Sequence, residues 1–470
     1  MRNVLFVSIE DLNDFIEPLG GHPDALTPTL SRLAARSAVF DRAYATVPAC
    51  SPSRSAALFG MAPWRTGIYG NAHDWRAAHP EGERLSLVGH MRDAGYATWG
   101  AGKVFHGKID ADDWDCWVDE PLDRHPPVSE LVQSGVVRPG DDFGPVDPEA
   151  PLHDDRIADR LIAEMRPGVS GRFWALGIYR PHLPFLAPRR HFDSLPARVA
   201  PPPGLKGVYD PDDLSEFERL PKGARRFIKT NWSIGRALHT HQAVNAYLRA
   251  YLASVSYADE VLGRVLAALE ASGLMADTTV VLWSDHGWQF GEKLAFRKFT
   301  LWERALRIPI MIAGPGISPR RIGQPVTNMD LMPTLLAHAG AAPKRPLDGR
   351  DLTPALEGDV DQAAVAVSVW GYPAFGLGTD RLAFSVRSAR WRLTQYWGGG
   401  RELYDHTSDP FEHRNLLADG DAEGDAAATL PGLVGHLPTD PAPSSPEVSG
   451  GGPAERARIR RLRAEGAAPG

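Results

Sequence analysis

The rest of this chain is organised around one short segment, Val47-Pro48-Ala49-Cys50-Ser51-Pro52-Ser53-Arg54-Ser55-Ala56-Ala57-Leu58-Phe59-Gly60. Pro52 suits the first position of a helix, where its missing N–H group costs nothing, and Gly60 suits the left-handed residue that ends one. Cys50 is therefore predicted to lie just before a short helix. Free N–H groups and the positive end of the helix dipole attract anions there, and the guanidinium group of Arg54 can add a bidentate hydrogen-bond donor. A thiol in this place is predicted to be acidic.

The composition is that of an ordinary globular protein with an anionic surface. With 470 residues, 43% hydrophobic and 23% charged, the chain predicts one large domain with a smaller companion. The net charge of -7 argues against nucleic acid or an anionic membrane as the main partner, so an anionic substrate needs a local basic cluster. Only Cys50 and Cys116 are present, which excludes a disulfide framework.

The first residues predict a cytoplasmic protein. Met1 to Asp11 reach a carboxylate pair too soon for a secretory apolar core, and no apolar run approaches membrane-spanning length. The sequence does not predict an oligomeric state.

Apolar runs rich in β-branched and aromatic residues predict buried strands of a parallel sheet. They are Val4 to Ile9, Tyr96 to Trp99, Phe173 to Tyr179 and Thr278 to Trp283. Apolar residues repeat with helical period from Tyr247 to Leu269, so this helix and the strand after it form part of a βαβ unit. The chain is thus predicted to be an α/β protein. Residues 201–235 are predicted to be a loop region, and His239 and His241 to be structural.

Each predicted strand ends in residues that one site could use. These are Glu10 and Asp11, Lys103 with His106, His182, and Asp285, followed later by Lys298. Ligands of open α/β sheets gather beyond the carboxyl ends of the strands, and Glu10, Asp11 and Asp285 could hold a hard cation there. Oxygen ligands favour calcium or magnesium over zinc. Taken singly, the carboxylates could instead cap a turn, and the lysines and histidines could be ordinary surface or satisfied groups.

Two motifs make the chain resemble the sulfatase family. Cys50-x-Pro52-x-Arg54 before a helix that ends in glycine is similar to its first signature, and Gly95 to Lys103 match Gly-Tyr-x-Thr-x-x-x-Gly-Lys at every fixed position. The resemblance extends to about Leu416 and is closest to the iduronate-2-sulfatase-like branch. The segments that carry this closer likeness are Gly102–His106, Arg180–Phe185, Ser284–Trp288, Glu402–His406 and Asp409-Pro410.

The resemblance implies an alkaline-phosphatase-like large domain, with a mostly parallel sheet flanked by helices, and a small C-terminal α+β subdomain with an antiparallel sheet. We place the large domain at residues 1–362 and the subdomain at 363–417. Residues 418–470 are rich in Ala, Gly, Pro and charge and are predicted to be a poorly ordered tail.

The resemblance also implies a site. A separate formylglycine-generating enzyme would oxidise Cys50 to formylglycine, and a divalent cation, usually calcium with magnesium or manganese as alternatives, would be held by the modified Cys50 and four further residues. Those four are Glu10, Asp11, Asp285 and His286. The family normally has aspartate at the position of Glu10, which puts the ion's identity and the ligand role of Glu10 in question. His286 is an unusual neighbour for a hard cation, although this branch shares it.

The function implied is a sulfuric ester hydrolase acting on a small sulfated sugar or metabolite by double displacement at sulfur. Arg54 and Lys103 would steady the hydrated aldehyde, His106 would act as base, and Lys298 or His182 would stabilise the leaving oxygen. The alternatives are a phosphonate or phosphate ester hydrolase on the same scaffold, and an unmodified, catalytically silent anion-binding protein. Residues 64–76 and 110–123 are predicted to line the substrate pocket and set specificity.

Overall fold

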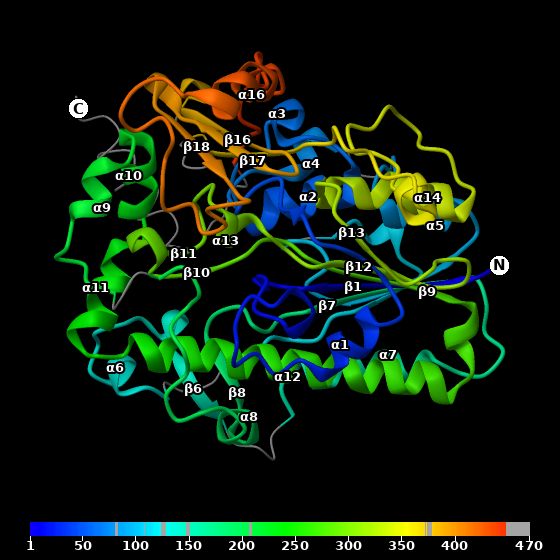
Figure 1. Cartoon of the computed structure of the whole chain (residues 1–470). Coiled ribbons are helices and arrows are strands. Elements are labelled where there is room, and N and C mark those ends of the chain that lie inside the picture. Colours follow the sequence, from blue (N-terminus) through cyan, green and yellow to red (C-terminus); the bar gives the residue numbers. More distant parts are fainter. Residues whose placement is uncertain are drawn as a thin grey trace.

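The computed structural model describes residues 1–79, 83–107, 109–123, 128–146, 151–205, 209–371, 373 and 378–447 (Figure 1). An eight-stranded sheet of order β13-β2-β12-β9-β1-β7-β4-β5 forms its centre, and a four-stranded antiparallel sheet of order β15-β16-β17-β18 lies towards the C-terminus. The strands of these two sheets are β1 Asn3–Ile9, β2 Ala38–Phe40, β4 Ala97–Gly102, β5 Cys116–Val118, β7 Arg172–Ile178, β9 Thr278–Ser284, β12 Ile310–Ala313, β13 Arg320–Ile322, β15 Ala366–Gly371, β16 Leu382–Arg387, β17 Trp391–Gln395 and β18 Arg401–Asp405.

Six strands outside these sheets form two-stranded pairs, namely β3 Ala43–Tyr44 with β14 Val326–Thr327, β6 Phe143–Val146 with β8 Phe185–Pro188, and β10 Gln289–Phe290 with β11 Phe296–Arg297. The α-helices are α1 Pro28–Ala34, α2 Cys50–Phe59, α3 Pro63–Thr66, α4 Trp75–Ala78, α5 Leu87–Asp93, α6 Glu130–Gln133, α7 His153–Glu164, α8 Arg189–Asp193, α9 Ser215–Arg219, α10 Lys222–Lys229, α11 Trp232–Thr240, α12 Val244–Ala271, α13 Glu303–Leu306, α14 Leu331–Ala339, α15 Thr353–Glu357 and α16 Gly424–Gly435.

The central sheet is buried on both faces because its strands are apolar on both. In β1, Leu5 and Val7 face a core shared with α1, α7 and α12, whereas Val4 and Phe6 face a second core shared with α2, α5 and α14. Figure 1 shows these two groups of helices on opposite sides of the sheet. Period-two alternation in a continuous apolar run thus gives the helix–sheet–helix layers of an α/β fold.

The neighbouring strands β9, β1, β7 and β4 are parallel and carry the predicted chemistry at one edge. Ile9 at the end of β1 is in register with Ser284 of β9 and with Ile178 of β7. Gly102 of β4 is in register with Gly177 of β7. The residues that follow these positions therefore meet beyond the carboxyl ends of the strands, and the predicted fold class is confirmed.

Two predictions about irregular regions are wrong. Residues 201–235, predicted to be loops, contain α9, α10 and the start of α11. Each of these helices is too short for its apolar residues to show a helical period in the sequence. In the structure, Phe217, Phe227 and Ile228 pack into a core with Tyr396 of the C-terminal region. Within the predicted tail, α16 is helical, and Ala426 and Leu433 pack against Leu393 and Leu403. The rest of that tail, residues 448–470, lies outside the described residues. The boundary at residue 362 stays a prediction.

Within the described residues, no helix combines the length and the hydropathy that crossing a membrane requires.

Asp259 of α12 caps another helix across the core. Its two carboxylate oxygens accept the N–H groups of Thr29 (2.9 Å) and Leu30 (2.8 Å), which are in the first turn of α1, where Thr27 offers no side-chain cap. Substitution Asp259→Ala leaves both buried donors without an acceptor and is expected to lower the free energy of unfolding by about 3 kcal/mol. Urea unfolding measures this effect.

The neighbouring substitution Glu260→Ala is the control, because Glu260 pairs with Arg190 on the surface, where the two side chains are 41% and 49% exposed. It is expected to change stability by less than about 1 kcal/mol. Equal losses in the two variants would contradict the capping role of Asp259.

Candidate active site

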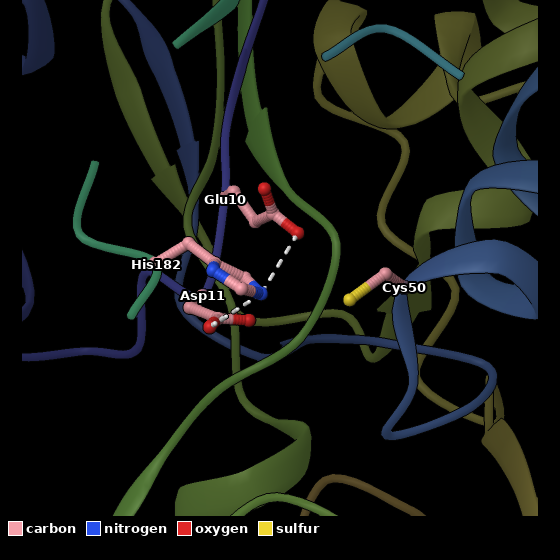
Figure 2. Close-up of side chains that lie close together, drawn as sticks. All are labelled: Glu10, Asp11, Cys50 and His182. Carbon is pink, nitrogen blue, oxygen red and sulfur yellow. Dashed lines mark ion pairs between the residues drawn. The ribbon is translucent and has the colours of Figure 1, made fainter. Parts of the chain in front are cut away.

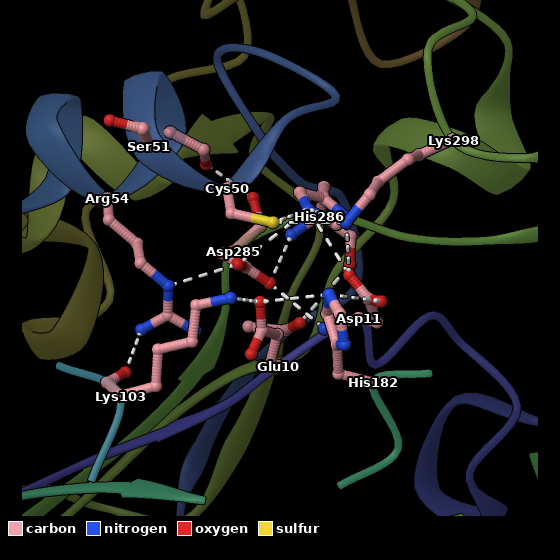
Figure 3. A network of polar contacts seen from close by, with 12 residues as sticks. Glu10, Asp11, Cys50, Ser51, Arg54, Lys103, His182, Asp285, His286 and Lys298 are labelled. Atoms are coloured by element: carbon pink, nitrogen blue, oxygen red, sulfur yellow. Dashed lines mark hydrogen bonds and ion pairs between the residues drawn. The ribbon is translucent and has the colours of Figure 1, made fainter. Parts of the chain in front are cut away.

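Cys50 is the first residue of α2 and points from the helix towards the carboxyl ends of the central strands (Figure 3). The sequence predicted that the helix would begin at Pro52, but Ala49 is the N-cap and Pro52 is the third helical residue. Proline is tolerated anywhere in the first turn, so it does not fix the start. Gly60 ends α2 with φ 63°, as predicted.

The thiol of Cys50 lies in a buried polar cluster. Its Sγ is 3.0 Å from Nζ of Lys298 and 3.3 Å from Nε2 of His286, and the residue is 1% exposed. Burial raises the pKa of the Cys50 thiol to about 12, with Lys298 acting in the opposite direction and Asp285 and Asp11 adding to the rise. The expected acidic thiol is therefore wrong, because loss of solvent and two carboxylates outweigh the helix terminus.

Asp11 and Asp285 follow adjacent strands and lie against each other. Oδ1 of Asp285 accepts the backbone N–H of Asp11 at 3.0 Å, and Nζ of Lys298 lies 2.9 Å from Oδ1 of Asp11. Burial raises the pKa of Asp11 to about 6, although Lys298 opposes this. Burial also acts to raise the pKa of Asp285, but His286, Arg54 and Lys298 hold it below its ordinary value. Asp285 is thus the firmly ionised carboxylate.

Glu10 lies beside His182 (Figure 2) and Lys103 (Figure 3). Nζ of Lys103 donates to Oε1 of Glu10, and Nε2 of His182 is 3.7 Å from the same oxygen and 3.9 Å from Oδ2 of Asp11. Nδ1 of His182 donates to the carbonyl of Leu183 at 2.6 Å, so the lone pair of the ring is on Nε2. Burial, together with Lys103 and Lys298, keeps the pKa of His182 well below its ordinary value.

Arg54 is buried under the cluster and cross-links three strand ends. Its Nε donates to Oδ2 of Asp285 at 3.1 Å, and its Nη1 donates to Oγ of Ser8 and to the carbonyl of Val104, each at 3.1 Å. His106 lies two residues after Val104, in the segment that follows β4. Burial and the charges of Lys103 and Arg54 keep the pKa of His106 well below its ordinary value. Its ring is accordingly neutral.

Lys298 directly follows β11, the second strand of the hairpin formed with β10, and the backbone on both sides of it is strained. Arg297 and Phe299 have φ angles of 68° and 80°, in a backbone region that residues other than glycine seldom adopt. Burial acts to lower the pKa of Lys298, but Asp11 and Cys50 raise it above its ordinary value, so the ammonium group is charged.

The donor set fits a hard cation. Single ligand atoms of Glu10, Asp11, Cys50 and His182 lie within 4.8 Å of one another, and so do those of Asp11, Cys50, Asp285 and His286. Oε2 of Glu10 and Oδ2 of Asp11 are buried and have no hydrogen-bond partner among the described residues, which is costly unless a cation or a donor meets them. All five predicted ligands lie in these two overlapping groups, and His182, predicted only as a catalytic residue, joins the first.

A similar-looking group is not such a site. Glu303, His406 and Glu412 also lie within 4.8 Å of one another. Arg392 pairs with Glu303 and, at 2.6 Å, with Glu412, and Arg387 lies 3.5 Å from Glu303, so two guanidinium groups neutralise the two carboxylates. This group is a buried salt-bridge network that joins α13 to the C-terminal sheet.

Sequence reasoning missed the residues that hold the helix of Cys50 in place. Asn328 donates to the backbone carbonyl (2.9 Å) and Oγ (2.7 Å) of Ser53, and its own Oδ1 accepts the N–H of Thr46. Asn71 accepts the N–H of Ser51 at 2.9 Å. Asparagines before a helix or in a loop look like ordinary caps and turn residues, so no signal in the sequence distinguishes them.

The comparisons with known proteins agree with this geometry. The sulfatase family model matches residues 2–341, and the model described as N-sulphoglucosamine sulphohydrolase, C-terminal, matches residues 291–429. The chain belongs to the sulfatase family. As a sulfatase it is a sulfuric ester hydrolase, and the resemblance found in the sequence is confirmed.

Three curated relatives show the range of this family. A sulfatase of Formosa agariphila is 32% identical over 88% of this chain and 82% of its own length. A choline-sulfatase of Rhizobium meliloti is 27% identical over the same shares of the two chains. The iduronate 2-sulfatase of Mus musculus is 30% identical over 67% of this chain and 59% of its own. These names differ in substrate, so the substrate of the present sulfatase is left undefined.

Among solved structures, the phosphonate monoester hydrolase SpPMH from Silicibacter pomeroyi has a TM-score of 0.72 with 23% identity. The likeness covers 93% of this sulfatase and 95% of that chain. At this identity the likeness shows the shared fold alone.

Proposed function

We propose that this sulfatase cleaves the sulfate ester of a small sulfated sugar or metabolite, using formylglycine made from Cys50 and a bound divalent cation. The observation that carries the proposal is the place of Cys50 Sγ, within 3.3 Å of both Lys298 and His286 and grouped with Asp11 and Asp285. A thiol with a pKa of about 12 is a poor nucleophile at neutral pH, so conversion to a hydrated aldehyde supplies the attacking hydroxyl.

In the first step, one hydroxyl of residue 50 gives its proton to the carboxylate of Asp11 and attacks sulfur. The sulfur–oxygen bond to the alcohol breaks, and its electrons leave with the alcohol oxygen. Lys298 is charged and adjacent to residue 50, so it stabilises and protonates that oxygen, while neutral His182 accepts a hydroxyl group of the substrate with the lone pair on Nε2. A bound cation supplies Lewis-acid polarisation of the sulfate oxygens.

In the second step, the remaining hydroxyl gives up its proton, its carbon–oxygen bond becomes the carbonyl, and the bond from that carbon to the sulfate oxygen breaks. Neutral His106 accepts the proton, and Arg54 and Lys103 hold the hydrate in place. Sulfate leaves and the aldehyde is regenerated.

We assign calcium to the site, with magnesium or manganese as alternatives, because its donors are mainly carboxylate oxygens. Asp11, Asp285, His286 and residue 50 would hold the ion. Glu10 pairs with Lys103, and its second oxygen Oε2 is the atom available to the ion. Glu10→Asp is therefore expected to change the ratio of calcium affinity to magnesium affinity and to leave the fold intact. Calcium and magnesium titrations of the wild type and the variant measure this ratio, and circular dichroism checks the fold.

Mass spectrometry of the peptide that contains Cys50 tests the modification. An aldehyde in place of the thiol supports the enzyme, and an intact thiol in active protein refutes the proposed nucleophile. The modification requires a formylglycine-generating enzyme as a transient partner in the host. We expect the pocket to be lined by residues 64–76 and 110–123, and neither nucleic acid nor a membrane to be a partner.

The second candidate is a phosphonate or phosphate ester hydrolase, favoured by the fold shared with SpPMH. Parallel assays of an aryl sulfate, a phosphate diester and a phosphonate monoester separate the two. We expect the highest kcat/KM for the sulfate ester, and a higher value for either phosphorus ester would overturn the assignment.

A further inference from the structure

The end of the described chain lies along a loop beside the candidate active site. We call residues 437–447 the C-terminal strap and residues 64–76 the wall loop. Five hydrogen bonds join them. They are Ala442 N to Trp64 O (2.7 Å), Ser445 N to Gly67 O (2.8 Å), Asp74 N to Pro446 O (2.6 Å), Tyr69 Oη to Ala442 O (2.7 Å) and Ser445 Oγ to Asp74 O (2.7 Å).

The strap is chemically suited to lie extended. Pro438, Pro441, Pro443 and Pro446 limit the backbone to extended conformations before it docks, so less conformational entropy is lost on docking. Figure 1 shows α16, which precedes the strap, on the same side of the molecule as α3. The strap thus supplies hydrogen-bond partners to the wall loop, which includes only parts of the four-residue helices α3 and α4.

The wall loop in turn contacts the helix of the nucleophile. Oδ1 of Asn71 accepts the N–H of Ser51, the residue after Cys50, whereas the N-cap residue Ala49 provides no side-chain acceptor. Asn71 is therefore the side-chain cap of α2, supplied from another segment. Any displacement of the wall loop removes this cap.

A buried histidine fixes the other side of the wall loop. Nδ1 of His73 accepts the N–H of Tyr69 at 3.0 Å, and Nε2 donates to the carbonyl of Pro373 at 2.8 Å. His73 also forms an isolated β-bridge with Glu447 of the strap. The wall loop is thus held between the strap and the C-terminal subdomain.

We propose that the C-terminal strap is a positioning element for the sulfatase reaction. Through the wall loop and Asn71 it holds the first turn of α2 so that residue 50 faces the sulfate ester. This inference rests on the proposed function, because it assigns the strap a role in presenting the nucleophile named there.

Truncation gives the first test. A chain that stops after His436 lacks the strap, and a chain that stops after Glu447 keeps it, so the second is the control. We expect the shorter chain to lose about tenfold in kcat at a temperature where circular dichroism shows it folded, and to exchange the amides of Ser51 and residues 66–74 at least tenfold faster. The longer chain is expected to match the full-length protein.

Gly67 gives the second test, because a side chain there collides with the strap. Gly67 has φ +74°, and a Cβ atom would lie 2.0 Å from the carbonyl oxygen of Pro443. Gly273 has φ +73° with nothing within 4 Å of such an atom. Gly67→Ala and Gly273→Ala therefore share the backbone strain, and only the first displaces the strap. We expect lower kcat and faster exchange in Gly67→Ala alone.

Two results would overturn the proposal. One is an unchanged kcat and unchanged exchange at Ser51 in the chain that stops after His436. The other is equal behaviour of the two glycine variants. If the full-length protein released no sulfate, the proposed function would fail, whereas amide exchange would still report whether the strap holds the wall loop and α2.

Discussion

Cys50→Ala is expected to lower sulfate release by about 10⁵-fold or more, because alanine has no thiol from which the aldehyde, and thus the proposed nucleophilic hydroxyl, can be made. The remaining charged groups, Lys298, Asp11 and Asp285, still bind anions and cations but have nothing to transfer sulfate to. Release of sulfate from an aryl sulfate, followed under single-turnover and steady-state conditions, measures the effect.

The fold is expected to survive this substitution. Cys50 is small and buried, and loss of its sulfur lowers the free energy of unfolding by only about 1 kcal/mol. Cys116→Ala is the matched control, since Cys116 is the other free cysteine and is exposed. It lies in the expected pocket wall, residues 110–123, so this variant is expected to keep kcat and to change KM at most. Undiminished turnover by Cys50→Ala would show that the chemistry does not use residue 50.

Asp11→Asn is expected to lower kcat by about 10³-fold and to weaken calcium binding by at least tenfold. The buried oxygens of Asp11 face Lys298 on one side and the proposed cation on the other, and an amide carries no charge to hold the ion. Calorimetric titration with calcium, together with activity after chelation and re-addition of calcium, measures both effects.

Asp14→Asn is the control for Asp11→Asn. It removes a buried carboxylate that is not a proposed ligand of the cation. Asp14 pairs with Arg304 and with Arg307, so its substitution is expected to reduce stability by about 3 kcal/mol and to leave the calcium requirement unchanged. Calcium affinity in Asp11→Asn equal to that of the wild type would exclude Asp11 as a ligand.

The fold and the membership of the site could be predicted because they depend on local patterns. Continuous apolar runs give parallel strands, and parallel strands bring their carboxyl ends to one edge, so Asp11, Lys103, His182 and Asp285 had to meet. The start of α2 and the pKa of Cys50 could not be predicted in the same way. They depend on Ala49, on desolvation and on carboxylates supplied by distant strands.

The described part of the predicted tail, residues 418–447, was mispredicted for a related reason. Its Pro and Ala content is typical of disordered tails, and its order comes from partners far away in the chain, such as Trp64 and Leu393. Asn71 and Asn328 were missed as supports of α2 because their partners are backbone groups, which leave no trace in residue type.

The late position of the strap in the sequence sets an order of events during synthesis. Tyr69 and Ala442, which share a hydrogen bond, are 373 residues apart. At roughly 5–20 residues per second, a ribosome takes about 20–75 s to travel from one to the other. For that interval the growing polypeptide has a wall loop without its strap, so Asn71 lacks the support through which we propose that the strap holds the first turn of α2.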